Sequence, residues 1–284
     1  MTILDAVLLG IIQGLTEFLP ISSTAHLTLA GKMLGLITPE KAAAWTSFMA
    51  VLQLGTLIAV LAFFLKDVRR MVAALVTDVR TNGGGGGLKG YSQDARLGIC
   101  ILAGSVPVGL VGLLLNDFLH SMFTKSTVVI VGSLVTLAAL LWVAEKTARH
   151  ARSLEHLALP DALLIGLAQV LALIPGSSRS GTTLTAGLFL GFTRPAAARF
   201  SFLLSIPAIL GSGLHELMGI DAGVFSFGVA NLALGTAIAA VSGYAAIAWL
   251  LRYLNTHTTM IFVWYRIALG LMLTILLLSG FMEP

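Results

Sequence analysis

Charged residues are scarce in this chain, and their scarcity excludes an ordinary soluble domain. Asp, Glu, Lys and Arg make up 11% of the 284 residues, where soluble proteins carry about 25%. Hydrophobic residues make up 57%, and the mean hydropathy is +0.95. Because long hydrophobic runs recur from one end of the chain to the other, the sequence predicts an all-α polytopic membrane protein.

Cysteine is almost absent, and several common site patterns are missing. The single Cys100 lies in a hydrophobic run, which excludes a disulfide framework and a cysteine-based metal site and favours a buried packing thiol. There is no HExxH motif, and the basic residues form no stripe with interleaved aromatics. Nucleic acid is therefore not an expected partner. The N-terminus lacks a basic segment followed by a cleavage site, so it is interpreted as mature structure and not as a signal peptide.

Six hydrophobic stretches are long enough to cross a bilayer, which takes about 20 apolar residues. They run approximately over Trp45–Leu65, Leu97–Leu119, Ser126–Ala144, Pro195–Leu214, Val224–Leu251 and Met260–Phe281. Two further regions are hydrophobic but interrupted, at 20–23 and at 175–178. Since each half of these regions is too short to span, we expect two re-entrant helical hairpins.

The interrupted regions resemble each other and indicate an internal repeat. Segments match at an offset near 155 residues, with a one-residue slip at the second match: 5–13 with 161–169, 20–28 with 175–183, 31–35 with 187–191 and 47–55 with 201–209. We interpret the chain as one membrane domain made of repeat 1 (about 1–144) and repeat 2 (about 161–284), joined by a cytoplasmic loop at 145–160. Each repeat has a hairpin and three spans, and the odd number of spans predicts inverted topology.

The positive charges predict the orientation. Twelve lysines and arginines fall on the side of the 66–96 and 145–160 loops, and three fall on the other side. The first side is therefore expected to be cytoplasmic, with both termini outside. The run NGGGGG at 82–87 in the first of these loops is interpreted as a flexible linker and not as a nucleotide-binding loop, because no GK[ST] follows it.

The first interruption lies in QGLTEFLPISSTAH at 13–26 and carries acid–base groups. A carboxylate at membrane depth, here Glu17, is a functional candidate by default, and Gln13 shares its helix face. The plain alternative is a structural Glu bonded between helices. Ser23 and His26 lie three apart on one face, as nucleophile and acid–base candidates.

Two residues of this stretch also have structural explanations, helix capping for one and an interhelical hydrogen bond for the other. Ser22 is an expected helix N-cap, and an interhelical hydrogen bond is the alternative for His26. Ser22 and Thr24 remain candidates for substrate contact.

The second interruption lies in PGSSRSGTT at 175–183 and predicts an anion site. A helix start, Gly176 and the guanidinium of Arg179 suit phosphate oxygens. Pairing of Arg179 with Glu17 alone is the structural alternative. The remaining candidates for hydrogen bonds to substrate are Ser178, Ser180, Thr183 and Ser177, the last with capping as its alternative.

Other polar residues carry weaker signals. Gln169 repeats Gln13, but Leu173 stands where the first copy has Glu17, and His26 aligns with Gly181. The acid–base chemistry is thus assigned to the first interruption. Arg266 in the last span is interpreted as a snorkelling anchor. Solvated roles are expected for the remaining histidines, which are His120, His150, His156, His215 and His257.

These two motifs make the chain similar to the undecaprenyl-diphosphate phosphatase family, the bacitracin-resistance proteins. That family is marked by (E/Q)-G-x-T-E-F-L-P-x-S-S-T-x-H and P-G-x-S-R-S-G-x-T, and the likeness in length, spans and repeat covers nearly the whole chain. The resemblance implies hydrolysis of undecaprenyl diphosphate to undecaprenyl phosphate and inorganic phosphate at the outer face of the bacterial inner membrane. It also implies catalytic roles for Glu17, Ser23, His26 and Arg179.

The resemblance further implies a divalent cation, Mg²⁺ or Ca²⁺, with Glu17 as its candidate ligand. Gln13 stands where many members have an acid, so the diphosphate oxygens are expected to supply much of the coordination. The expected partners are the polyprenyl diphosphate lipid and the bilayer, and a homodimer is compatible with both.

Two other functions were weighed. A polyprenyl-phosphate flippase or other secondary transporter also fits inverted repeats with broken helices. A type-2 phosphatidic-acid phosphatase shares the reaction, but its Pro-Ser-Gly-His and later His-x-x-x-Asp patterns are missing here.

Overall fold

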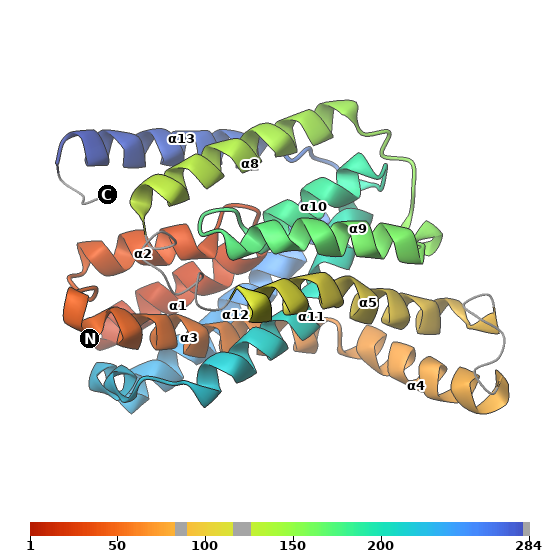
Figure 1. Ribbon diagram of the computed structural model, residues 1–284, viewed down its shortest axis with the longest axis horizontal. Helices are drawn as coiled ribbons and strands as arrows, with labels where there is room; N and C mark the ends of the chain where they lie inside the picture. Colours follow the sequence, from red (N-terminus) through yellow and green to blue (C-terminus); the bar gives the residue numbers. More distant parts are fainter. Residues whose placement is uncertain (83–89, 116–125, 281–284) are drawn as a thin grey trace.

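The described part of the chain is helical. A computed structural model describes residues 1–82, 90–115 and 126–280, and Figure 1 shows their helices running mostly along one direction. Within those ranges the only β-type pairing is an isolated bridge between Arg152 and Phe192. The α-helices are α1 Ile3–Phe18, α2 Ser23–Met33, α3 Ala42–Phe63, α4 Leu65–Asn82, α5 Gln93–Leu114, α8 Thr127–Thr147, α9 Leu159–Val170, α10 Arg179–Phe189, α11 Arg194–Met218, α12 Val229–Leu254 and α13 Met260–Leu278. The 3-10 turns are η1 Pro39–Lys41, η3 Leu154–His156, η4 Leu171–Leu173 and η5 Ala222–Phe227.

Six of these helices are long and apolar enough to cross a membrane, and they are the six that the sequence predicted. They are α3, α5, α8, α11, α12 and α13. The fifth span starts later than expected, because η5 occupies its first residues and Gly228, with φ of 90°, turns the chain into α12. The expected end of the second span at Leu119 lies outside the described residues.

Helix α4 corrects the prediction that residues 66–96 form a loop. Its buried side packs against α5 through Met71, while Val72, Val76 and Val79 on the other side are exposed. The sequence analysis missed this helix because its charges lower its mean hydropathy, although an amphipathic surface helix needs only one apolar face. The predicted NGGGGG linker lies, from residue 83 on, outside the described residues.

Ion pairs gather at the end of the bundle that carries α4, on the right in Figure 1. Arg194 pairs with Glu145, joining α11 to α8, and Arg199 lies 2.8 Å from Asp67 of α4. Arg152 in the 148–158 connection lies 2.6 Å from Asp161 of α9. The hydrogen bonds that its guanidinium donates to this carboxylate hold the pKa of Arg152 above its usual range.

One histidine also belongs to this charged end. The solvated role predicted for His150 is wrong, because its Nε2 lies 3.3 Å from the Arg194 guanidinium and 3.8 Å from the Glu145 carboxylate. Among the other histidines, His156, His215 and His257 are exposed as expected, and His120 lies outside the described residues. Cys100 is buried, as predicted.

Both predicted interruptions are breaks between two short helices. The first break, 19–22, separates α1 from α2, and the second break, 174–178, separates η4 from α10. The residue before each following helix has an unusual positive φ, 75° at Ser22 and 68° at Ser178. Each of these serines caps its helix by accepting a hydrogen bond from the backbone three residues on. Both breaks therefore end in the same local conformation.

Each short helix before a break packs closely on a long helix from the other half of the chain. A Cβ at Gly14 of α1 would lie 2.0 Å from Ser242 Oγ of α12. A Cβ at Gly166 of α9 would lie 2.1 Å from the Gly104 carbonyl oxygen of α5. Only glycine permits such a close approach of two backbones. Inside a membrane, where the hydrophobic effect does not drive helices together, close packing at small residues holds them.

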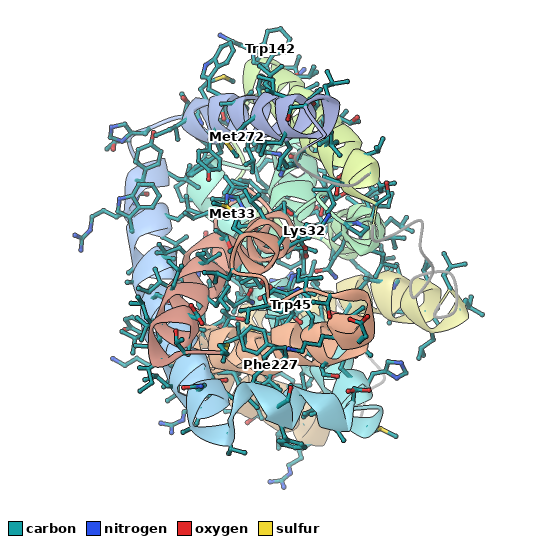
Figure 2. All side chains as sticks on the ribbon, turned by 90° about the vertical axis from the view of Figure 1, so that its left-hand side faces the viewer. Lys32, Met33, Trp45, Trp142, Phe227 and Met272 are labelled. Atoms are coloured by element: carbon teal, nitrogen blue, oxygen red, sulfur yellow. The ribbon has the colours of Figure 1, made fainter. Side chains whose placement is uncertain are left out.

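The opposite end of the bundle, on the left in Figure 1, holds the start of α1 and the end of α13. In the end-on view of Figure 2, Trp45 and Phe227 lie close together there, and Lys32 and Met33 mark the end of α2. The Trp45 and Phe227 rings are 6.4 Å apart, and both pack on Phe48. This aromatic cluster fixes η5 against the start of α3.

Candidate active site between the two helix breaks

Glu17 is the last residue but one of α1, directly before the first break, and is 6% exposed. Its Oε2 accepts hydrogen bonds from Gln13 Nε2 at 3.1 Å and from Ser23 Oγ at 2.7 Å. Its other oxygen, Oε1, accepts from the guanidinium of Arg179. Both oxygens of this buried carboxylate therefore have hydrogen-bond partners, so burial leaves neither of them unsatisfied.

Ser23 is the first residue of α2, and its hydroxyl points back at Glu17. This short hydrogen bond places a carboxylate where it can take the Ser23 proton, the arrangement that an activated nucleophile needs. Glu17 therefore contacts the Ser23 hydroxyl, whereas the ring nitrogens of His26 bond elsewhere.

His26 lies one turn further along α2 and turns toward α13. Its Nδ1 is 2.7 Å from the Ser22 carbonyl oxygen, and its Nε2 is 2.6 Å from the Tyr265 hydroxyl. A carbonyl can only accept, so Nδ1 carries the proton, and in the neutral ring Nε2 accepts from Tyr265. Both ring nitrogens are therefore occupied by groups other than Ser23.

Arg179 opens α10, directly after the second break, and is the charged member of the second motif. Its guanidinium reaches Glu17 on one side and the Ser205 carbonyl oxygen of α11, at 3.3 Å, on the other. The side chain keeps 16% of its surface exposed. The structural alternative for Arg179, a pairing with Glu17, is thus present. The same contact places the donors of the guanidinium next to the carboxylate that is the acid–base candidate.

The neighbouring hydroxyls of the second motif are mostly engaged within the protein. Ser178 is the helix cap, so the expected alternative of a cap at Ser177 is wrong; the Ser177 hydroxyl is 1% exposed and has no partner within the described residues. Ser180 donates to the Leu19 carbonyl oxygen of the first break at 3.0 Å. Thr183 donates to the Arg179 carbonyl oxygen at 2.8 Å and lies 2.6 Å from Ser201 Oγ.

Glycine at 176 is required by the course of the chain. Its φ is 91°, and a Cβ there would lie 2.2 Å from Ser133 Oγ of α8. The second break therefore lies directly against α8, without space for a side chain.

The caps also correct the expected register between the two motifs. Ser22 and Ser178 occupy equivalent backbone positions and differ by 156 in number (178 − 22), as do Asp5 and Asp161 in the first turns of α1 and α9 (161 − 5). The one-residue slip is absent here. At this spacing Ser23 matches Arg179 and His26 matches Thr182 instead of Gly181.

Arg266 is not the snorkelling anchor that the sequence analysis expected. It is 1% exposed, and its guanidinium donates to backbone carbonyl oxygens of both breaks. The sequence analysis made no prediction for Tyr265, the residue before it. The available signal was a polar pair inside the last span, where ionisable groups are costly and so mark a site.

Two adjoining cavities open beside these residues. The smaller, of about 140 Å³, is lined by Gln13, Ser23 and Thr24, together with Gln53 of α3 and Glu216 of α11. The larger, of about 640 Å³, continues from Thr24 and Glu216 between α2, α3, α5 and α11. Most of its lining is apolar, and its ionisable side chains are Lys32, His215 and Glu216. Gln53 and Glu216 were missed by the sequence analysis.

The described residues do not by themselves supply a site for the expected divalent cation. Both Glu17 oxygens are taken, one of them by a cation. Within the described ranges, no three His, Cys, Asp or Glu residues are grouped so that they could hold a metal. Mg²⁺ and Ca²⁺ are coordinated by six or more oxygen ligands, so any such ion would depend on oxygens from a bound molecule.

Comparison with known proteins gives one consistent result. The family model described as bacitracin resistance protein BacA matches residues 6–272. An undecaprenyl-diphosphatase of Syntrophobacter fumaroxidans is 48% identical over 275 residues, which cover 95% of each chain. An undecaprenyl-diphosphatase of Myxococcus xanthus is 49% identical over 284 residues, covering 100% of this chain and 92% of the relative. One of Chloroherpeton thalassium is 46% identical over 292 aligned positions, covering 100% of this chain and 99% of the relative.

Proposed function

The chain belongs to the bacitracin resistance protein family, and on that basis we propose that it hydrolyses undecaprenyl diphosphate to undecaprenyl phosphate and inorganic phosphate. The reaction recycles the carrier lipid of peptidoglycan synthesis. One observation carries the proposal for this chain. A buried carboxylate, a serine hydroxyl and an arginine converge from two helix breaks beside an apolar cavity.

Arg179 and the start of α10 hold the diphosphate. The guanidinium offers donors beyond those used on Glu17 and Ser205, and the first turn of a helix adds unpaired N–H groups and a partial positive charge. Both stabilise negative charge that shifts within the phosphoryl group in the transition state. Gln13 and Thr24 line the small cavity beside this place and contribute hydrogen bonds to the same group.

Glu17 acts as the base. In the covalent route it takes the proton of Ser23 while Oγ attacks the terminal phosphorus, the bond from phosphorus to the bridging oxygen breaks, and undecaprenyl phosphate leaves. Water then hydrolyses the phosphoserine. In the direct route Glu17 takes a proton from the attacking water. The 2.7 Å hydrogen bond from Ser23 to Glu17 favours the covalent route. His26, which is hydrogen-bonded to Tyr265, transfers protons at the edge of the site.

The larger cavity receives the lipid. Its lining is apolar near Met49, Val108 and Pro207, and it joins the small cavity at Thr24. An apolar lining of this kind binds a polyprenyl chain favourably, while the headgroup lies in the small polar cavity. A divalent cation of the kind that the family resemblance implies would need the diphosphate oxygens as ligands, because the described residues hold no group of acids for it.

The two breaks are tips of re-entrant hairpins in an inverted repeat of the bacterial inner membrane. The matching caps at Ser22 and Ser178 support the repeat, as does the reciprocal packing of α1 on α12 and of α9 on α5. The basic residues near α4 favour that end as cytoplasmic, with both termini outside. The large cavity, whose lining includes Lys32 in the last turn of α2, then lies toward the outer side. That two copies of this chain form a homodimer stays a prediction.

Phosphate release by the purified protein in detergent tests the function. Detergent micelles have no sealed compartment, so a flippase or transporter without hydrolytic activity releases no phosphate. We expect release of one phosphate per undecaprenyl diphosphate, with undecaprenyl phosphate as the second product. Lack of release under conditions where a relative is active would reject the proposal.

A further inference from the structure

Arg266 of α13 joins both breaks to a third helix. Its NH1 donates to the Pro20 carbonyl oxygen of the first break at 3.1 Å. Its NH2 donates to the Gly176 and Ser177 carbonyl oxygens of the second break at 3.1 and 3.2 Å. Its Nε donates to the Leu134 carbonyl oxygen of α8 at 3.1 Å. One side chain thus bonds three separate stretches of backbone.

The carbonyl groups of Pro20, Gly176 and Ser177 lie in the breaks and need a donor. Where a helix is interrupted, the carbonyl groups around the break have no partner within the helix, and inside a membrane there is little water to replace it. A guanidinium has five donors in a fixed planar fork, so it can serve several carbonyl groups at once, which the single nitrogen of a lysine cannot.

Arg266 is also a buried cation that does not form an ion pair. Within the described ranges, the ion pairs at membrane depth include Glu17 with Arg179 but none with Arg266, and its bonded partners are all backbone carbonyl groups. Gly181 of α10 gives it room, because a Cβ there would lie 3.2 Å from NH1. The arginine is therefore built into the break region and not directed outward.

Tyr265, the preceding residue, contacts the first motif by itself. Its hydroxyl lies 2.6 Å from His26 Nε2, and the two rings stack with centroids 5.6 Å apart. Two consecutive residues of one helix thus bond the acid–base histidine and both breaks.

We propose that Tyr265 and Arg266 are positioning residues of the active site. Arg266 fixes the first break against the second, which sets Glu17, before one break, opposite Arg179, after the other. Tyr265 fixes the ring and tautomer of His26. This inference rests on the proposed hydrolysis, and it adds α13 to the elements that set its geometry.

The test uses the full-length protein in detergent, with undecaprenyl diphosphate as substrate, and compares Arg266→Lys and Tyr265→Phe with wild type. Arg266→Lys keeps the charge but cannot bond both breaks. We expect kcat to fall about 10- to 100-fold with KM changed less than threefold, since small displacements of catalytic groups have effects of this size. Arg199→Lys, at an ion pair far from the breaks, is the matched control and should leave both constants unchanged.

Tyr265→Phe removes one neutral hydrogen bond from His26. We expect the pH dependence of kcat to shift by about half to one pH unit, the equivalent of one such bond. Tyr253→Phe on α12, whose ring stacks on Trp249, is the matched control and should not shift it.

The outcomes separate this inference from the function. If wild type releases no phosphate, the proposed function fails. If wild type is active and Arg266→Lys raises KM without lowering kcat, or Tyr265→Phe leaves the pH dependence unchanged, the positioning roles are wrong. If Arg266→Lys does not fold, hydrogen exchange of wild type decides. The hydrogen-bonded amides at the breaks, those of Ile21, His26, Ser177 and Thr182, should exchange as slowly as those in the middle of α3, and fast exchange there would contradict the anchoring.

Discussion

Arg179 donates a hydrogen bond to Glu17 across 162 positions of the sequence. One residue precedes the first helix break, and the other follows the second. The pair therefore closes a site that neither half of the chain can form alone. A mobile water-exposed pair of this kind would contribute little, but this carboxylate is buried and its remaining oxygen is held by Ser23 and Gln13. The account of the reaction depends on this contact.

Ser23→Ala tests the covalent route. If Ser23 attacks phosphorus, the variant should lose about 10³-fold or more in kcat, because removing a nucleophile disables the unit to which it belongs. Quenching wild type with labelled substrate should trap a phosphoserine at 23. Ser22→Ala, which removes only a helix cap, is the control and should lower stability by about 1 kcal/mol with a smaller effect on kcat. Activity of Ser23→Ala within tenfold of wild type, with no trapped intermediate, would establish water as the nucleophile.

Gly14→Leu and Gly166→Leu test the close packing that carries the breaks. Each side chain would enter the backbone of a facing helix, so we expect destabilisation of about 1–3 kcal/mol or failure to fold. The melting temperature in detergent measures this. Gly132→Leu on α8, where a new Cβ meets nothing within 4 Å, is the matched control. Equal melting temperatures for all three variants would contradict the close approach of α1 to α12 and of α9 to α5.

The sequence predicted those parts of the molecule that depend on local composition. Six apolar stretches became the six long helices, and Pro20 and Pro175 marked the two breaks, because a proline with polar residues beside it favours a helix end. Pro107 and Pro207, which lie in apolar stretches, are inside α5 and α11. The likeness of the two motifs located the candidate site residues. The contact of Arg179 with Glu17 was among the alternatives that the sequence offered.

The remaining features depend on tertiary packing, which a single sequence does not specify. Arg266 reads as an anchor near a span end until the carbonyl groups that surround it are known. His26 shares a helix face with Ser23, yet its ring turns to Tyr265 because Ser22 holds Nδ1. Helix α4 was missed because a helix with one apolar side resembles a charged loop when only mean hydropathy is considered.

Divalent cations test how the diphosphate is held. Both oxygens of Glu17 are bonded, and among the described residues no group of acids surrounds it. Mg²⁺ or Ca²⁺ alone should therefore leave the melting temperature of the protein unchanged. Adding undecaprenyl diphosphate with the ion should raise it, and EDTA should remove that increase and the activity together. An increase with the ion alone that disappears in Glu17→Gln would instead show a site made by the protein.

Cysteine labelling in whole cells tests the orientation. In a Cys100→Ser background, Met33→Cys at the end of α2 should react with a membrane-impermeant maleimide from outside. Thr77→Cys on the exposed side of α4 should react only after the membrane is permeabilised. The reverse pattern would place the large cavity at the cytoplasmic face.

The most direct test of the account is a double-mutant cycle on Glu17 and Arg179, measured as phosphate release from undecaprenyl diphosphate in detergent. Glu17→Ala and Arg179→Ala should each lower kcat/KM by at least about 10²-fold, as expected for a lost base and a lost charge-stabilising donor. The double variant should be little worse than either single one, because the two residues act as a unit. The ion pair of Asp67 and Arg199 is the matched control, and its Ala variants should stay within about threefold of wild type. Near-normal rates in both single variants, or fully multiplicative losses in the double one, would contradict an active site formed by this pair.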